Sequence, residues 1–185
     1  MKRLFDVIFS VIIIILLFFP IILISILIKI TSKGSVLYWS ERIGQNNNVF
    51  LMPKFRSMNE NTPQLATDLL KNPGEHITGI GAFLRKTSID ELPQIWSILI
   101  GEMSFIGPRP ALFNQYDLIE MRTNKSIHIL KPGLTGWAQV NGRDNISLNK
   151  KIDYDYFYLK NKSFILDCKI IILTFIKVIK KDDVL

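Results

Sequence analysis

The sequence predicts a small α/β protein, mostly helical, which is a monotopic membrane protein with an N-terminal, proline-kinked re-entrant helix. Its 185 residues suit one domain of ordinary size with an appendage and leave little room for two full domains. Residues 7–28 carry no charge, as a membrane segment requires. Short apolar runs between turn residues and longer runs with helical spacing predict a small strand element and interfacial amphipathic helices in the rest of the chain.

The apolar segment Val7–Ile28 would measure about 33 Å as a straight helix, close to the roughly 30 Å hydrocarbon core of a bilayer. A secretory signal peptide is disfavoured because no alanine precedes Ala66 to form a cleavage site. A spanning helix stays open as the main alternative to a re-entrant one.

Two features of this segment favour re-entry. Pro20 lies near its middle, where proline removes a backbone hydrogen bond and kinks a helix. Basic residues flank both ends, so the positive-inside rule favours neither spanning orientation. A helix that bends at Pro20 and returns to the same face accounts for both facts, and Ser25 is a candidate partner for the freed backbone groups. The flanking basic residues are Lys2, Arg3, Lys29 and Lys33.

Two short strands are expected next, at Ser35–Trp39 and Val49–Met52, with a turn at Gln45–Asn48 between them. Lys54 and Arg56 flank an apolar residue, which places both cations on one face of a strand. A solvated face is the default interpretation of such a pair.

Apolar spacing predicts helices at Glu91–Leu99 and Ala111–Met121. Asn59–Glu75 is expected to be a surface loop with a helical piece around Leu65–Leu70. The glycine-containing stretch Lys131–Arg143 is expected to be an ordered loop rather than a helix.

Phe164–Lys181 predicts an amphipathic helix. Lys169, Lys177 and Lys180 fall within an arc of about 80°, opposite a wide apolar side. A helix on an anionic membrane surface is favoured, and a buried core helix stays open.

The chain carries 23 lysines and arginines against 16 aspartates and glutamates, a net charge of +7. This balance favours an anionic partner, but the cations are scattered and no nucleic-acid-binding motif is visible, so no nucleic acid is expected. The single cysteine, Cys168, excludes a disulfide framework, and two histidines argue against a histidine metal site. A bound metal is therefore expected on oxygen ligands, as Mg²⁺ or Mn²⁺.

The densest polar cluster suggests phosphate chemistry. Asp90 and Glu91 are adjacent carboxylates that can bind Mg²⁺, and Arg85 and Arg109 can neutralise phosphate oxygens. The alternative is a helix start, either a capping box from Ser88 to Glu91 or an N-cap at Asp90. Capping and catalysis do not exclude each other.

A second candidate group lies in the later glycine-containing stretch. Gln139, Asn141 and Arg143 could line a nucleotide or sugar site near Trp137. A loop packed by its own tryptophan is an equal alternative.

Four motifs occur in one order along the chain. Together they closely resemble those of the bacterial sugar transferases, the monotopic polyprenol-phosphate phosphoglycosyl transferases, over almost the whole chain. One departure is the helix break, which is Phe19-Pro20 here where some members have Ser-Pro. The motifs are Lys54-Phe55-Arg56-Ser57-Met58, Asp90-Glu91-Leu92-Pro93-Gln94, GEMSFIGPRP at 101–110 and KPGLTGWAQVNGR at 131–143.

The resemblance implies transfer of a sugar 1-phosphate from a UDP-sugar to undecaprenyl phosphate, with release of UMP, as the first membrane step of surface-glycan synthesis such as O-antigen or capsule. It implies Asp90 as the nucleophile that forms a covalent phosphosugar intermediate, Glu91 as its partner in acid–base or metal work, and Mg²⁺ as cofactor. Arg85 and Arg109 match positions near the phosphate, and Lys54 and Arg56 match the family's basic pair. The expected donor is a UDP-N-acetylated amino sugar.

The expected location is the cytoplasmic face of the bacterial inner membrane, with residues 1–30 as the re-entrant helix and residues 31–185 as the catalytic domain. The lipid bilayer is a partner, and a homodimer is left open. Two rival hypotheses are direct transfer without a covalent intermediate, with Asp90 and Glu91 as metal ligands only, and a non-enzymatic scaffold that binds anionic lipid.

Overall fold

The structure is a computed structural model that describes residues 2–63, 72–142 and 146–180. The chain forms two compact units. Unit 1 comprises Met1–Ser40 and Leu51–Leu99, and unit 2 comprises Glu41–Phe50 and Ile100–Asp183. The predicted division between residues 1–30 and 31–185 concerns the membrane, and it stays a prediction.

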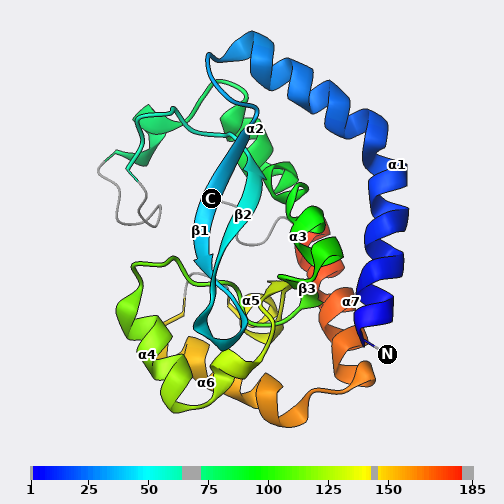
Figure 1. The fold of residues 1–185 in the computed structure, drawn as a ribbon, viewed down its shortest axis with the longest axis vertical. Helices are drawn as coiled ribbons and strands as arrows, with labels where there is room; N and C mark the ends of the chain where they lie inside the picture. The colour runs from blue at the N-terminus through cyan, green and yellow to red at the C-terminus, as the bar shows by residue number, and fades with distance from the viewer. Residues whose placement is uncertain (1, 64–71, 143–145, 181–185) are drawn as a thin grey trace. The chain divides into compact units, whose positions relative to one another are not determined.

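Unit 1 is built on the long helix α1 and on short elements around one core. Ile28, Phe55 and Leu84 are buried together, and half-buried apolar residues pack against them. The β1–β2 pair forms a two-stranded sheet, and both strands continue into unit 2. The elements are α1 (Lys2–Thr31), β1 (Leu37–Ile43), β2 (Val49–Phe55), α2 (Gly81–Lys86), a 3₁₀ turn at Ile89–Glu91 and α3 (Gln94–Ile100), and Figure 1 labels the helices and strands.

Helix α1 is attached to unit 1 at both of its ends. At its start, Arg3 donates from Nη1 to the carbonyl oxygen of Ile98 and from Nη2 to that of Leu99, both at 2.6 Å. These carbonyls end helix α3, where no intrahelical donor remains. At its other end, Ile28 is buried in the unit 1 core.

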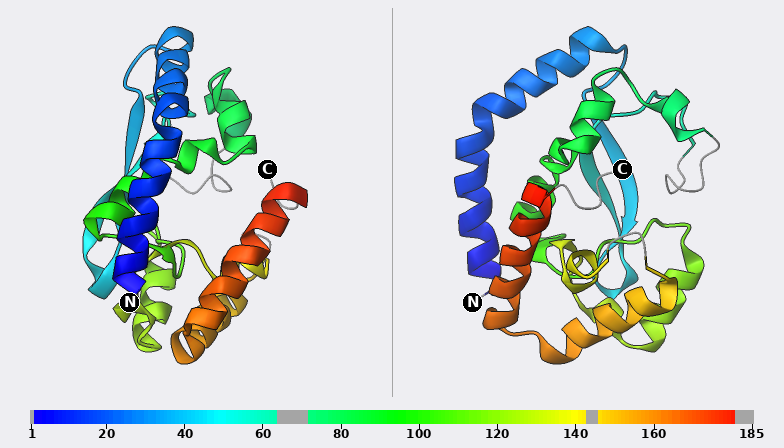
Figure 2. Two further views of the ribbon diagram at one scale, coloured as in Figure 1. Left: turned by 90° about the vertical axis from the view of Figure 1, so that its right-hand side faces the viewer. Right: turned by 180° about the vertical axis from the view of Figure 1, so that it is seen from behind.

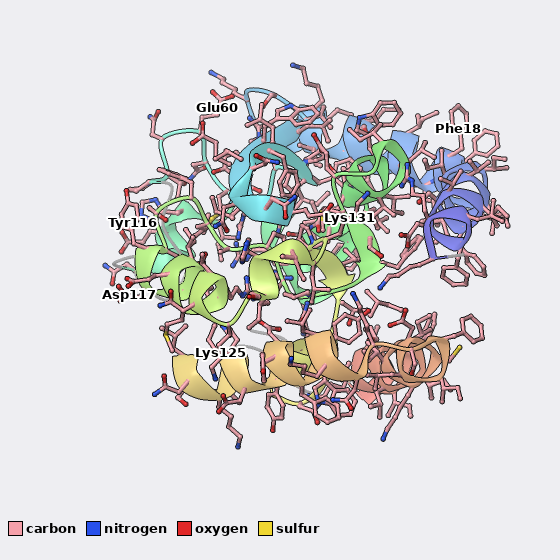
Figure 3. The ribbon with its side chains drawn as sticks, turned by 60° about the horizontal axis from the view of Figure 1, so that its bottom comes forward. Phe18, Glu60, Tyr116, Asp117, Lys125 and Lys131 are labelled. Carbon is pink, nitrogen blue, oxygen red and sulfur yellow. The ribbon has the colours of Figure 1, made fainter. Side chains whose placement is uncertain are left out.

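The middle of α1 is exposed and apolar. Among the described residues, α1 is the one helix long and apolar enough to cross a membrane, and 6% of its most apolar window is buried. Phe18 points away from the ribbon in Figure 3. Water is a poor solvent for such a surface. The predicted apolar helix is therefore confirmed, whereas its re-entry into a bilayer stays a prediction.

Proline lies inside α1, and Figures 1 and 2 show that the helix axis changes direction along its length. Pro20 has no N–H to offer the carbonyl of Leu16, four residues earlier. Ser25 donates instead to the carbonyl of Ile21, at 2.7 Å. The expectation that Ser25 serves the groups freed at the proline is therefore wrong, because it bonds a carbonyl on the other side of the break.

Unit 2 packs helices around a short parallel strand pair. The strands β3 (Ser104–Ile106) and β4 (Gly133–Thr135) pair in parallel. Figure 1 shows α4 beside α6, and Figure 2 shows the chain turning from α6 into α7. The helices are α4 (Tyr116–Asn124), α5 (Trp137–Val140), α6 (Leu148–Asn161) and α7 (Phe164–Lys180).

Three glycines allow the β3–β4 backbones to approach closely. A Cβ on Gly107 would lie 2.3 Å from the carbonyl oxygen of Lys131, and one on Gly133 would lie 2.1 Å from the amide nitrogen of Gly107. A Cβ on Gly136 would lie 2.0 Å from the carbonyl oxygen of Gly107. Backbone atoms cannot move aside as flexible side chains do. The glycines of two separate sequence motifs are therefore needed for one packing contact.

Helix α7 has both a core face and an exposed apolar face. Ile170 is fully buried in a cluster with Ile106, Val140 and Tyr158. Other apolar side chains of α7 are exposed, among them Phe164, Ile165, Ile172, Phe175, Ile176 and Val178. The core alternative thus accounts for one face of the helix, and contact of the other face with a membrane stays a prediction.

Several predicted elements differ from the observed ones. The first strand begins two residues later than expected and extends to Ile43, and the second extends to Phe55. The loop expected at 131–143 contains β4 and α5, so the expectation that it lacks a helix is wrong. The helix expected from Ala111 begins at Tyr116. The sequence did not predict α2, β3 or α6, and the helical piece expected at 65–70 lies outside the described residues.

Candidate functional site

The predicted site residues fall into two groups, one in each unit. Unit 1 holds Lys54, Arg56, Arg85, Asp90 and Glu91. Unit 2 holds the three residues Arg109, Gln139 and Asn141. Arg143 lies outside the described residues.

Two adjacent carboxylates occupy the 3₁₀ turn between α2 and α3. The backbone reverses at Ser88, which has a φ of +55°, and this turn then presents Asp90 and Glu91 ahead of α3. Asp90 is 8% exposed, and Glu91 is half-buried. Both carboxylates are therefore recessed, and burial strengthens their interactions with nearby charge.

The turn is not the helix start that the sequence suggested. Helix α3 begins at Gln94, directly after Pro93, so the N-cap expected at Asp90 is wrong. Ser88 precedes the 3₁₀ turn, and its side chain makes no capping hydrogen bond. Neither of the two expected N-cap residues, Ser88 and Asp90, is therefore the N-cap of α3.

Glu91 is bound instead by a lysine from β2. Lys54 Nζ donates to Glu91 Oε1 at 3.0 Å, and the two side chains are 16% and 14% exposed. Lys54 lies near the end of β2, and this strand brings its positive charge to the carboxylate pair from a distant part of the sequence. Lys54 is therefore placed in the acidic centre of unit 1, and not on a solvated strand face.

Arg56 lies directly after the same strand but binds a different group. Its Nη2 donates to the carbonyl of Ser32 at 3.0 Å and to the Ser32 hydroxyl at 2.8 Å, and its Nη1 donates to the carbonyl of Lys33. Glu60 accepts a further bond from Nη1 at 3.3 Å. The buried guanidinium thus fastens the end of α1, and its predicted contact with phosphate stays a prediction.

Arg85 comes from the last turn of α2. The side chain is half-buried, and its Nη1 lies 3.5 Å from the sulfur of Met58. A thioether is a weak hydrogen-bond acceptor, so this contact restrains the guanidinium only slightly. The structure therefore places Arg85 on α2, the helix that packs against the carboxylate turn.

In unit 2, Arg109 lies in the segment Pro108–Ala111. Every backbone carbonyl of this segment accepts a hydrogen bond. Its prolines cannot donate, and each of its four successive carbonyl oxygens accepts a hydrogen bond from a different residue. The donors, in the order of the carbonyls, are Gly133 N at 2.9 Å, Arg122 Nη1 at 2.8 Å, Arg42 Nη1 at 3.2 Å and Ile43 N at 2.9 Å.

Sequence reasoning missed Arg122 on α4 and Asp155 on α6. Both side chains are buried and form an ion pair of 2.6 Å. Burial raises the pKa of Asp155, and Arg122 and Lys151 oppose that rise. A signal was present, because Asp155 falls at i+3 from the buried Ile152 within α6, and a charged residue on an apolar face is unusual.

The remaining predicted residues lie on or beside α5. Asn141 donates from Nδ2 to the carbonyl of Trp137 at 2.7 Å. Trp137 stacks on Phe157, with ring centroids 5.4 Å apart. The structure thus supports the packed-tryptophan alternative for these two residues.

Gln139 behaves differently from its neighbours. Both atoms of its side-chain amide are buried, and neither has a hydrogen-bond partner in the described part of the chain. A buried amide without partners is costly and rare. Gln139 therefore stays a candidate for a ligand contact.

The two carboxylates of unit 1 are the candidate ligands for a metal ion. Within the described residues, no group of three or more histidine, cysteine, aspartate or glutamate side chains is placed to hold a metal. Mg²⁺ is commonly held by one or two carboxylates together with substrate phosphates. A pair of oxygen donors without sulfur or imidazole fits Mg²⁺ on that pattern, with Asp90 and Glu91 as the residues that would hold it.

Comparison with known proteins gives consistent matches. A family model described as bacterial sugar transferase matches residues 1–181. The "Uncharacterized sugar transferase EpsL" of Bacillus subtilis is 39% identical over 188 residues, which cover 100% of this chain and 90% of that protein.

Two further relatives carry names that state a reaction. A "UDP-N-acetylgalactosamine-undecaprenyl-phosphate N-acetylgalactosaminephosphotransferase" of Aeromonas hydrophila is 39% identical over 85% of this chain. A "UDP-glucose:undecaprenyl-phosphate glucose-1-phosphate transferase" of Klebsiella pneumoniae is 39% identical over 95% of this chain. The chain covers 39% of the length of each of these two relatives.

Proposed function

Because this chain belongs to the bacterial sugar transferase family, we propose that it transfers a sugar 1-phosphate from a UDP-sugar to undecaprenyl phosphate and releases UMP. The observation that carries this proposal is the recessed Asp90–Glu91 pair, to which Lys54 adds a positive charge. Two relatives are named for this class of reaction. The product would be the first lipid-linked intermediate of a surface glycan.

The proposed reaction has two half-reactions at Asp90. A carboxylate oxygen of Asp90 attacks the β-phosphorus of the UDP-sugar, the bond from that phosphorus to the bridging oxygen breaks, and UMP leaves with that oxygen. A phosphate oxygen of undecaprenyl phosphate then attacks the same phosphorus, and the Asp90 carboxylate leaves. Splitting one difficult transfer into two steps is the usual benefit of a covalent intermediate.

The other residues of unit 1 stabilise negative charge in this scheme. A carboxylate attacking a diphosphate meets like charge, so positive groups must stabilise the transition state. We assign this role to Arg85 and Lys54, and the pairing of Lys54 with Glu91 holds that lysine in place. Mg²⁺, held by Asp90 and Glu91, would supply further neutralisation of phosphate oxygens. In unit 2, Arg109 would bind phosphate through its guanidinium.

The donor we propose is a UDP-N-acetylated amino sugar. The relative from Aeromonas hydrophila, which is named for N-acetylgalactosamine, supports this choice. A relative of equal identity is named for glucose, so the donor is the part of the proposal that a substrate panel tests first.

The topology we propose is a re-entrant α1 with both ends on the cytoplasmic face. A straight spanning helix would place its ends on opposite sides of the membrane, but both ends of α1 bind the same compact unit. Basic residues flank both ends, which the positive-inside rule places in the cytoplasm. The exposed apolar side of α7 would rest on a membrane surface.

Cysteine labelling tests this topology. Cys168 is the single cysteine, so a Cys168→Ser background carries one new cysteine at Lys2→Cys. In intact cells a membrane-impermeant thiol reagent added outside is expected to leave this cysteine unlabelled, and lysis is expected to expose it. Labelling in intact cells would support a spanning helix and overturn the re-entrant proposal.

Release of UMP tests the reaction. The purified protein is incubated with undecaprenyl phosphate and, in turn, UDP-N-acetylglucosamine, UDP-N-acetylgalactosamine, UDP-glucose and UDP-galactose. One of the amino sugars is expected to support UMP release, and Asp90→Asn is expected to abolish it. Asp153→Asn is the matched control, because Asp153 is an exposed aspartate that pairs with Lys125 in unit 2 (Figure 3 labels Lys125). A lipid-binding scaffold would release no UMP with any donor.

A further inference from the structure

We propose that Asp155 is a positioning residue, which acts through Arg122 to hold Arg109 in the geometry that binds phosphate. This inference rests on the proposed function, and it concerns two residues that no sequence motif pointed to. All three residues belong to unit 2, so their contacts lie within one compact body.

Each of the three nitrogens of the Arg122 guanidinium donates to one of two partners. Its Nε and Nη2 donate to Asp155 Oδ2 at 3.1 and 2.6 Å, and its Nη1 donates to the carbonyl oxygen of Arg109 at 2.8 Å. The guanidinium is a rigid plane, so fixing two of its nitrogens fixes the direction of the third. Asp155 thereby orients Arg122 Nη1, which donates to the carbonyl oxygen of Arg109.

The carbonyl of Arg109 is held by Arg122, which is itself paired with the buried Asp155. The neighbouring carbonyls of Pro108 and Ala111 are bonded by backbone amides, and that of Pro110 by Arg42. Bonds to charged donors are stronger than bonds between neutral groups. Arg122 therefore restrains the peptide plane that carries the Arg109 side chain.

Arg122 and Asp155 are both buried, and their hydrogen bonds in the described part of the chain are with other protein groups. Asp155 is 1% exposed, and the nitrogens of Arg122 already have protein acceptors. An ion pair buried in this way often stabilises a fold no better than apolar residues of similar size. The role we assign to the ion pair is to orient the hydrogen bond to the Arg109 carbonyl. This orientation matters because a small misplacement of a phosphate-binding group costs much activity.

A double-mutant cycle tests the coupling. UMP release from a donor labelled in the nucleotide is measured for the wild type, Asp155→Asn, Arg109→Ala and the double variant. Asp155→Asn is expected to lower kcat/KM by about 10- to 100-fold in the wild type, on the scale of a misplaced binding group. In the Arg109→Ala background the same change is expected to cost less than about threefold, because the side chain that it positions is gone.

Two results of this cycle overturn the proposal. One is an equal loss from Asp155→Asn in both backgrounds, which a general structural role would give. The other is wild-type activity in Arg109→Ala, which would remove Arg109 from phosphate binding. Where turnover falls below detection, the dissociation constant for UDP on the same four proteins gives the same cycle.

A second variant keeps the proposal testable if Asp155→Asn does not fold. Arg122→Met combined with Asp155→Leu replaces the ion pair by apolar side chains, a change that proteins often tolerate. We expect a melting temperature near that of the wild type and a kcat/KM that is still about 10- to 100-fold lower. Wild-type activity in this variant would show that the pair serves stability alone, and would overturn the proposal.

Failure of the inference differs from failure of the proposed function. If the wild type releases no UMP with any donor of the panel, the proposed function is wrong. If the wild type is active but the cycle is additive, the transferase assignment stands and the positioning role of Asp155 is wrong.

Discussion

Arginines bind backbone carbonyls in both units, but they hold different kinds of structure. In unit 1, Arg3 and Arg56 bond carbonyls at the end of α3 and just after the end of α1, and so fasten the two ends of the apolar helix. In unit 2, Arg42 and Arg122 bond the carbonyls of a turn that contains two prolines. The first pair secures a helix whose middle is apolar and not covered by protein, and the second secures the backbone of a candidate phosphate-binding residue.

The difference shows that the sequence motif of a cation does not by itself determine which groups its side chain binds. Arg56 belongs to a motif that suggested phosphate binding, yet its guanidinium is buried on the end of α1. Arg122 belongs to none of the motifs and is tied to a buried carboxylate. What a cation does follows from its burial and its acceptors, which the motif alone does not contain.

The largest expected effect on stability comes from breaking the buried pair of unit 2. Arg122→Met leaves the Asp155 charge buried without its partner, which costs about 3–5 kcal/mol in comparable cases. Denaturant unfolding in detergent measures the change. Adding Asp155→Leu is expected to recover most of the loss, and a single variant as stable as the wild type would contradict the account.

A smaller loss is expected when the end of α1 is released. Arg56→Met removes charged donors from the carbonyls of Ser32 and Lys33, at a cost of about 1.5–3 kcal/mol. Lys33→Met is the control, because it removes a positive charge at the same turn without removing those bonds. UMP release per folded molecule is expected to persist in Arg56→Met. Lost activity with unchanged stability would instead make Arg56 a substrate ligand.

The start of α1 is held more weakly. Arg3 is exposed, so Arg3→Met is expected to cost about 0.5–1 kcal/mol through the carbonyls that end α3. Arg3→Lys keeps the charge but cannot bind both carbonyls in the same geometry. Its stability should therefore fall between that of the wild type and that of Arg3→Met. A thermal-shift series in detergent compares the three proteins. A loss in Arg3→Met as large as that in Arg56→Met would remove the contrast between the two ends.

The smallest expected effect is a dependence of stability on pH. Burial raises the pKa of Asp155 above its ordinary value of 3.8, so the native state holds that proton more tightly than the unfolded state does. The free energy of unfolding is therefore expected to fall as pH rises from 3.8 through the raised pKa. In Asp155→Asn this contribution is absent. The free energy of unfolding of both proteins is measured at a series of pH values. If the wild type gains stability relative to Asp155→Asn as pH rises, the predicted direction is wrong.

Long apolar patterns predicted the fold best. Helices α1 and α7 each follow from one continuous pattern. Helix α6 was missed because Asp155 interrupts its buried face, and the pattern cannot show that Arg122 compensates the charge. The stretch at 131–143 was expected to be a loop because its glycines suggest turns, whereas Gly133 and Gly136 permit close backbone contact with Gly107.

The candidate site was predictable where a motif is local. Adjacent carboxylates at Asp90 and Glu91 are visible in the sequence, and the structure places both on one turn. The bond between Lys54 and Glu91, and that between Arg56 and the end of α1, join distant parts of the chain. No local sequence pattern indicates such contacts, because the partners come together only when the chain folds.

The central claim is that Asp90 forms a bond to phosphorus, and mass spectrometry of the intact protein tests it most directly. The purified protein is incubated with Mg²⁺ and the active UDP-sugar in the absence of undecaprenyl phosphate. We predict UMP release of at most one equivalent and a protein mass increased by one sugar phosphate, which peptide mapping places on Asp90 and which Asp90→Asn does not acquire. Turnover with acceptor present, but no UMP release and no added mass without it, would contradict the claim and favour direct transfer.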